Sequence, residues 1–209
     1  MYDVKHFKAH NNEEVFEFMK AHPFVTVCVM SDDGFPVATH VPIVIEERDG
    51  KLIFSAHIMR KQLHTLAFEQ QSKVLVMFTG NHSYISATNY ENPATASTWN
   101  YKAVHCKGIL NFVGDEGLLS ILTKLTHQFE QNMHSPALVE KMDATYLQQQ
   151  TKAIVGFEIE VVDVQHIFKL SQNKTAEARN NIVNSLLQSG NNNEIQMAND
   201  IKSFYNSNS

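Results

Sequence analysis

The order of hydrophobic and polar residues along the chain predicts a mostly antiparallel β-structure. Short apolar, β-branched runs are separated by turn signals such as Ser31-Asp32-Asp33-Gly34 and Asp49-Gly50. The predicted strands cover residues 24–30, 35–45, 52–54, 74–78, 98–113 and 154–168. Because the first three follow one another through short turns, they indicate an antiparallel meander rather than a doubly wound parallel sheet.

Helical periodicity separates several of these strands and continues beyond the last of them. Helices are predicted after a cap within residues 11–14, from about residue 58 to 71, after Asp115, after Thr175 and after residue 193. Asp115 and Thr175 are residue types that cap helix N-termini, and Gly190 is a natural helix stop. The second of these helices is expected to hold Arg60 and Lys61 in its first turn.

These elements predict a mainly β fold with flanking helices (α+β), built as an antiparallel six-stranded barrel. The 209 residues, 43% of them hydrophobic, fit one domain or one domain with an extension. We expect a barrel domain over residues 1–170 and a C-terminal helical extension over residues 171–209, packed on or near the barrel. No apolar run reaches the roughly 18 residues of a membrane span, and the polar N-terminus does not resemble a signal peptide.

Charge and cysteine content narrow the function classes further. The formal net charge of −5 does not favour nucleic acid as a partner, because phosphate binding depends largely on Lys and Arg. The two cysteines lie 78 residues apart and form neither a zinc pattern nor a disulfide framework. We therefore expect a soluble, reduced, cytoplasmic protein without membrane attachment.

Two polar segments suggest a binding site in the first half of the chain. Thr39 and His40 lie beside Pro42, which removes a backbone donor and marks an edge or a bulge where polar side chains can meet a ligand. Arg60 and Lys61 in a first helical turn would oppose the helix dipole, and a bound phosphate would resolve this. The alternatives are an outward-facing strand surface and two solvated cations.

Two further segments lie in the second half. Residues 80–86 and 98–101 bring the single tryptophan, Trp99, close to several tyrosines, including Tyr101. Aromatic rings with polar handles suit a planar heterocycle or a subunit interface, and the alternative is an aromatic core cluster. Residues 169–174 are too polar for a core yet separate two well-formed elements, so they form either part of a site or an ordinary loop.

Taken together, these segments resemble the PaiB family of FMN-binding proteins, described as negative transcriptional regulators. The chain has ATHVP at residues 38–42, GNHSYIS at 80–86, TWNYKAVH at 98–105 and KLSQNK at 169–174. The family has A-T-H-L-P, G-P-H-A-Y-I-S, T-W-N-Y-x-A-V-H and K-L-S-Q-N-K in the same order. The chain departs from the family at Asn81, where the family tends to have proline, and beyond about residue 190.

The resemblance implies the flavin-binding split β-barrel shared with pyridoxamine-phosphate oxidase. It implies a homodimer with FMN at the subunit interface. It also implies that the barrel domain expected over residues 1–170 is the part that binds FMN. The residues assigned to FMN are Arg60 and Lys61 at the phosphate, Thr39 and His40 at the ring edge, and Trp99, Tyr101, Lys169 and Gln172 from the partner subunit. No paired carboxylates or nucleophile triad emerge, so any chemistry would belong to the flavin.

The activities that fit this reading are a flavin-dependent oxidoreductase and a regulator that acts indirectly on transcription. Two alternatives stay open. A direct DNA-binding repressor is disfavoured because residues 174–209 hold three cations and three anions, whereas a recognition helix needs basic and amide side chains. A haem-binding or haem-degrading split-barrel protein is suggested by the 11 histidines, but these are scattered and no metal ligands are assigned.

Overall fold

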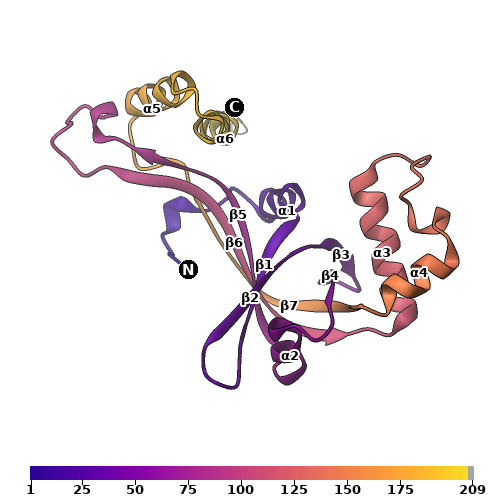
Figure 1. Cartoon of the computed structure of the whole chain (residues 1–209). Helices are drawn as coiled ribbons and strands as arrows, with labels where there is room; N and C mark the ends of the chain where they lie inside the picture. The colour runs from indigo at the N-terminus through magenta and orange to yellow at the C-terminus, as the bar shows by residue number, and fades with distance from the viewer. Residues whose placement is uncertain (207–209) are drawn as a thin grey trace. The chain divides into compact units, whose positions relative to one another are not determined.

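The computed structural model describes residues 1–206 and contains a seven-stranded β-sheet in the order β2-β1-β5-β6-β7-β4-β3 (Figure 1). The strands are β1 (Phe24–Met30), β2 (Pro36–Pro42), β3 (Val44–Arg48), β4 (Lys51–Met59), β5 (Lys73–Ile85), β6 (Thr98–Phe112) and β7 (Ile154–Lys169). The helices are α1 (Asn12–Ala21), α2 (Leu63–Gln70), α3 (Asp115–Glu130), α4 (Ala144–Thr151), α5 (Ala176–Gln188) and α6 (Asn192–Asn206). Short 3-10 helices cover Lys5–Phe7, Ala87–Asn89 and Val139–Lys141.

The expected mainly β fold with flanking helices is confirmed, but the expected number of six strands is wrong. The predicted strand over residues 35–45 is two strands, because Pro42 has no backbone N–H to continue the ladder. The backbone N–H of Ile43 instead donates to the carbonyl oxygen of Pro23 at 2.9 Å. β2 then pairs antiparallel with β1, and β3 pairs antiparallel with β4, so the two halves lie at opposite ends of the strand order.

The chain forms two compact units, and β5, β6 and β7 each contribute residues to both. The first unit contains residues 1–19, 79–104 and 165–209, and the second contains residues 20–78 and 105–164. β5 continues to Ile85, so it is longer than the strand expected over residues 74–78. The boundary predicted between residues 170 and 171 stays a prediction. Within residues 1–206 no helix combines the length and the apolar character needed to cross a membrane.

The second unit has an aromatic core with α3 packed beside it. The rings of Phe54 and Phe78 meet edge to face at 5.5 Å between centroids, and both are fully buried. α3 comes close to β7 at Gly156, where an added Cβ atom would lie 3.2 Å from the Cα atom of Leu118 and 2.9 Å from a Val113 methyl group. Glycine at this position therefore allows α3 to approach the sheet.

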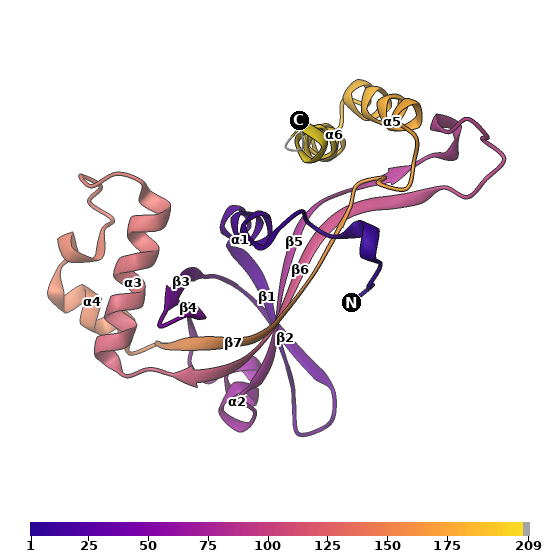
Figure 2. The same cartoon turned by 180° about the vertical axis from the view of Figure 1, so that it is seen from behind.

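The first unit is held together by α1, α5 and α6. Figures 1 and 2 show α5 and α6 side by side. The ammonium group of Lys102 lies over the rings of Phe18 and Phe168, at 5.1 and 4.6 Å from their centroids. The same group is 3.5 Å from the carboxylate of Asp200 on α6. Through Lys102, β6 therefore contacts α1, β7 and α6.

The helix termini confirm some expected signals and correct others. Thr175 caps α5 by accepting a 3.2 Å hydrogen bond from the N–H of Ala178, and Gly190 (φ +72°) follows that helix as expected. Asp115 is the first residue of α3 and not its cap, which is Gly114. α4 was not expected from the sequence, and its cap Asp143 accepts a hydrogen bond from the N–H of Tyr146.

α2 begins at Leu63, five residues later than expected. β4 continues through Ile58 and Met59 because these residues pair with Val155 and Ile154 of β7. Arg60 and Lys61 consequently lie in the turn between β4 and α2, and the expectation that they occupy the first helical turn is wrong.

Candidate functional site

The turn after β4 presents two adjacent cations to solvent. Its backbone is anchored by the N–H of Arg60, which donates to the carbonyl oxygen of Ala153 at 2.9 Å. Lys61 has a φ of +60°, a conformation that is uncommon for residues other than glycine and that often accompanies function. Both side chains are exposed, and neither forms an ion pair with another residue in the described part of the chain.

The N-terminus of α2 adds further donors beside these cations. Its N-cap residue, Gln62, makes no side-chain capping hydrogen bond, and the first turn contains no acidic residue. The first backbone N–H groups of a helix have no partner within the helix, and they carry partial positive charge. The two cations and the uncapped terminus form a donor set that suits a phosphate group.

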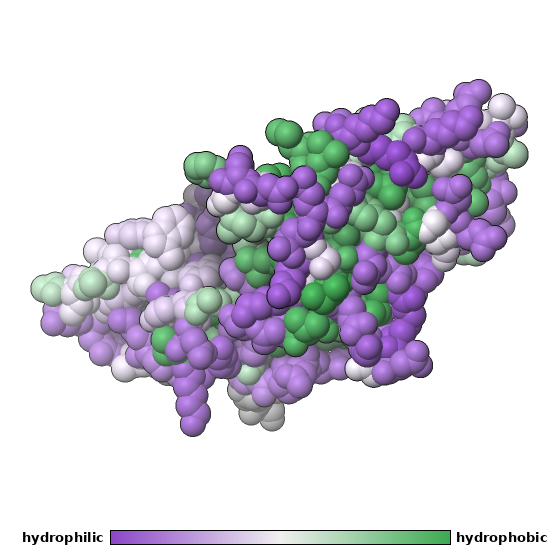
Figure 3. Space-filling view, turned by 90° about the horizontal axis from the view of Figure 1, so that it is seen from below, coloured by the Kyte–Doolittle hydropathy of each residue, from purple (hydrophilic) through white to green (hydrophobic). Residues whose placement is uncertain are grey.

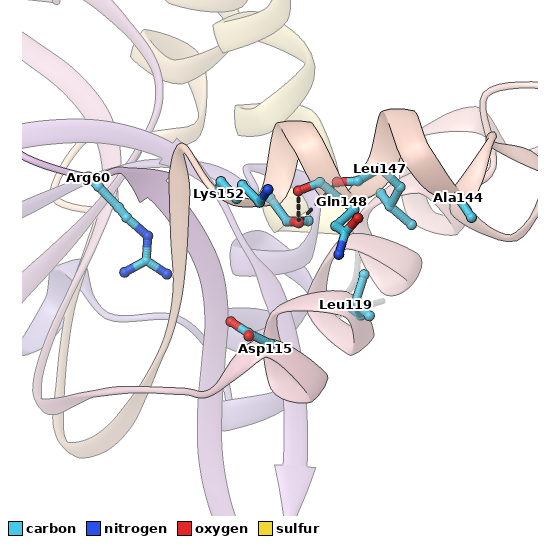
Figure 4. A pocket seen from close by; sticks show the side chains of 8 residues that line it. Arg60, Asp115, Leu119, Ala144, Leu147, Gln148 and Lys152 are labelled. Carbon is cyan, nitrogen blue, oxygen red and sulfur yellow. Dashed lines mark hydrogen bonds between the residues drawn. The ribbon is translucent and has the colours of Figure 1, made fainter.

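Arg60 also lines a cavity of about 610 Å³ in the second unit (Figure 4). The other lining residues come from α3 and α4 and from the residue after α4; they are Asp115, Leu119, Ala144, Leu147, Gln148, Thr151 and Lys152. The hydroxyl of Thr151 is already bound to the carbonyl oxygens of Leu147 and Gln148, at 3.0 and 3.3 Å. Arg60, Lys152, Asp115 and Gln148 therefore supply the polar side chains that a ligand could meet there.

Thr39 and His40 lie on the edge strand β2, in agreement with the edge signalled by Pro42. His40 is exposed and its ring stacks with Phe24 at 6.1 Å, whereas Thr39 is half-buried. Consecutive residues of a strand point to opposite faces. A ligand on one face of β2 therefore meets one of the two side chains, and a ligand across its free edge can meet both.

Trp99 and Tyr101 belong to the first unit, on the side of β6 opposite Lys102. Trp99 is 52% exposed, and its ring contacts Tyr84 at 5.9 Å and His82 at 6.1 Å between centroids. Tyr101 is half-buried, and this burial raises the pKa of its phenol. His82, Tyr84 and Trp99 form an exposed aromatic surface rather than an aromatic core.

The side chains of Lys169 and Gln172 are less available to a ligand than the polar character of residues 169–174 suggests. The ammonium group of Lys169 donates to the hydroxyl of Thr98 and lies 5.6 Å from the ring centroid of Phe7. Burial, with a smaller effect of Lys174, lowers the pKa of Lys169. The side-chain amide of Gln172 accepts from the N–H of Leu170 at 2.8 Å and donates to the carbonyl oxygen of Phe168, so it is used within its own loop.

The candidate residues thus fall into two groups. Thr39, His40, Arg60 and Lys61 belong to the second unit, and Trp99, Tyr101, Lys169 and Gln172 belong to the first. Sequence reasoning missed His57 on β4, whose Nδ1 atom is buried without a hydrogen-bond partner among the described residues. Burial lowers the pKa of His57, so its neutral imidazole is a polar group that a ligand can satisfy. The feature of the sequence that could have identified His57 is its position among the apolar residues of the mostly buried strand β4.

Comparison with known proteins gives a family match and a relative that aligns over nearly the whole chain. Residues 1–163 match the family model described as "Putative FMN-binding domain". Over 198 residues the chain is 36% identical to the protein "Protease synthase and sporulation protein PAI 2" of Bacillus subtilis, and the match covers 95% of each chain.

Solved structures of distant relatives share the fold. The FAD and heme binding protein from Mycobacterium smegmatis superposes with a TM-score of 0.59 at 16% identity, over 77% of this chain and 72% of that one. The conserved hypothetical protein Rv2991 from Mycobacterium tuberculosis also gives a TM-score of 0.59, at 12% identity, over 83% of this chain and 92% of that one. At these identities the similarity concerns the fold alone.

Proposed function

The chain belongs to the family of FMN-binding domains whose model it matches over residues 1–163, and we propose that FMN binds with its phosphate at Arg60 and Lys61. The turn after β4 is the observation that carries this proposal. Its two cations lack an ion pair with any described residue and stand next to an uncapped helix N-terminus. An FMN phosphate carries between one and two negative charges near neutral pH and would accept hydrogen bonds from both side chains.

The flavin ring would extend from this turn toward polar groups of the second unit. Thr39 and His40 offer a hydroxyl and an imidazole at the edge of β2. The unpartnered Nδ1 atom of His57 supports a polar heterocycle as ligand, because a buried polar atom without a partner is costly. When bound, FMN would supply electron-transfer chemistry, while the protein side chains would hold it and set its electrostatic surroundings.

A second copy of the chain would complete a split barrel and its sites. In this proposal the partner subunit supplies Trp99, Tyr101, Lys169 and Gln172. The exposed aromatic surface at Trp99 supports an interface there. Phe35 and Leu63 in the second unit are 72% and 81% exposed, and hydrophobic residues reach the surface in the view from below (Figure 3). Contiguous apolar surface is typical of interaction sites, and a dimer interface would cover these exposed side chains.

The biochemical role would be that of a flavin-dependent oxidoreductase or of a regulator that acts indirectly on transcription. The link to regulation comes from the name of the Bacillus subtilis relative, which refers to protease synthesis and sporulation. Direct DNA binding is not part of the proposal, because the cations and anions between residues 174 and 206 are equal in number. A cytoplasmic location stays a prediction.

Titration with FMN, combined with light scattering, tests this proposal. We expect saturable quenching of flavin fluorescence at one FMN per chain, and a molar mass twice that of the 23.7 kDa chain. Absence of saturable binding at micromolar FMN would contradict the cofactor assignment. A monomer that binds FMN would contradict the shared site alone, and an absorbance spectrum that responds to haem but not to FMN would favour the haem alternative.

A further inference from the structure

A second cavity, of about 350 Å³, lies between α5 and α6 in the first unit. It is outside the 163 residues that match the FMN-binding family model, and it contains none of the residues proposed to bind FMN. Its polar lining consists of two cations, three asparagine side chains and one phenol: Arg179, Lys202, Asn180, Asn184, Asn206 and Tyr205.

The cavity between α5 and α6 is lined by positively charged side chains, Arg179 and Lys202. No carboxylate belongs to the lining within the described residues. Asp200, on the same helix as Lys202, accepts a 2.9 Å hydrogen bond from the amide of Asn81 and lies 3.5 Å from the ammonium group of Lys102. The helix pair therefore concentrates positive charge at the cavity although the segment has no net charge.

Tyr205 presents a polar atom whose hydrogen-bonding capacity is unused. Its hydroxyl is buried and has no hydrogen-bond partner in the part of the chain that the structure describes. The guanidinium group of Arg179 lies over the Tyr205 ring at 4.2 Å from the centroid and donates to the carbonyl oxygen of Lys174. Burial raises the pKa of Tyr205, so the phenol keeps its proton and its O–H can donate a hydrogen bond to a ligand.

We propose that the cavity between α5 and α6 binds a small organic oxyanion, a carboxylate or a phosphate ester. Arg179 and Lys202 would neutralise its charge, the hydroxyl of Tyr205 would donate a hydrogen bond, and the asparagine amides would recognise further polar groups. A volume of about 350 Å³ is close to the lower end of ligand pockets, so the ligand would be a small molecule rather than a nucleic acid or a peptide.

Nuclear magnetic resonance titrations of the full-length protein test this site. The probes are inorganic phosphate and, separately, citrate, and the readout is the shift of the side-chain amide signals of Asn180, Asn184 and Asn206. We expect saturable shifts, and the anion that binds more tightly identifies phosphate or carboxylate as the preferred group. Lys202→Gln should weaken binding about tenfold or more, because it removes a charge-assisted hydrogen bond.

Two further variants separate specific binding from general charge attraction. Tyr205→Phe should weaken binding severalfold and leave the fold intact, because the hydroxyl it removes has no partner in the described protein. Lys5→Gln removes the same charge from an exposed residue of the first unit that does not line the cavity, and it should leave binding unchanged. Unsaturable or absent shifts, or equal weakening by Lys5→Gln and Lys202→Gln, would overturn the proposal.

Discussion

The side-chain amide of Asn100 donates a 2.8 Å hydrogen bond to the hydroxyl of Ser171, and both residues are buried. This bond joins β6 to the loop after β7 across 71 residues of sequence. Ser171 has a φ of +64°, so a non-glycine residue is held in a left-handed conformation there. The two segments that carry much of the family resemblance are therefore fixed to each other through their buried residues, and Trp99 and Lys169 lie one and two residues from these in the sequence.

Replacing Ser171 by alanine should lower the free energy of unfolding by about 1–3 kcal/mol. The substitution leaves the amide of Asn100 buried without its acceptor and keeps the unfavourable φ. Ser185→Ala on the exposed side of α5 is the matched control and should change the free energy by less than about 0.5 kcal/mol. Chemical denaturation of the three proteins measures both values. Equal stability of the Ser171 and Ser185 variants would show that the buried bond contributes nothing.

Gly108 on β6 should tolerate no side chain. An added Cβ atom would lie 2.4 Å from a methyl group of Ile159 and 2.8 Å from the carbonyl oxygen of Glu160. Gly108→Ala should therefore destabilise the protein by about 1–3 kcal/mol or more, because β6 and β7 must separate. Gly114→Ala meets open space and should cost less than about 1 kcal/mol as an N-cap replacement. Similar melting curves for both variants would contradict this close strand approach.

His57 should make stability depend on pH in the weakly acidic range. Burial lowers its pKa in the folded state, so the unfolded chain binds more protons between that pKa and the ordinary value of about 6.5. The free energy of unfolding should therefore fall as the pH drops through this window, and the penalty should be complete below the folded-state pKa. Denaturation at several pH values should show a smaller fall for His57→Gln. An identical pH dependence in both proteins would mean that His57 ionises equally in both states.

In the proposed FMN site, Lys169 should tune the reduction potential of the bound flavin. A positive charge near the ring favours the reduced, negatively charged flavin, so Lys169→Ala should lower the FMN reduction potential and Lys169→Arg should largely restore it. A spectroscopic redox titration of the FMN-bound proteins measures this effect. An unchanged potential in the alanine variant would leave residues 169–174 as a connecting loop that serves only structure.

The elements with strong local signals were predictable from the sequence. β1 matches the expected residues 24–30, and the Thr175 cap and the Gly190 stop delimit α5 as expected. Pro42 correctly indicated an edge strand. The sequence did not show that the strand divides there, because the division depends on β2 pairing with β1 and β3 pairing with β4.

The remaining differences come from tertiary contacts that override local pattern. Ile58 and Met59 have apolar side chains compatible with a helix, and only their pairing with β7 keeps them in β4. α4 has no buried residue, so it leaves no apolar periodicity in the sequence, and Asp143 was its main signal. The sequence shows a polar side chain at Gln172. It does not show that this side-chain amide bonds to the backbone of Phe168 and Leu170, because those bonds depend on the conformation of the folded loop.

The same distinction applies to the candidate site. Arg60 and Lys61 were identified because two cations in an expected first helical turn would oppose the helix dipole, although they lie in the turn before α2. Gln148 and Lys152 could not be identified, because they line the same cavity as Arg60 only through the placement of α4 (Figure 4). The unpartnered state of His57 likewise depends on the neighbours that the sheet supplies.

The affinities of FMN and riboflavin for the wild type and for Arg60→Ala test the phosphate assignment most directly. The two flavins differ only in the phosphate, and each charge-assisted hydrogen bond contributes about 1.5–3 kcal/mol. We expect Arg60→Ala to weaken FMN binding about tenfold to a hundredfold or more. Riboflavin should bind the wild type weakly and respond little to the substitution. Arg48→Ala, which breaks a surface ion pair with Glu158 at 2.7 Å, is the matched control and should leave FMN affinity unchanged. Equal wild-type affinities for FMN and riboflavin would contradict the account.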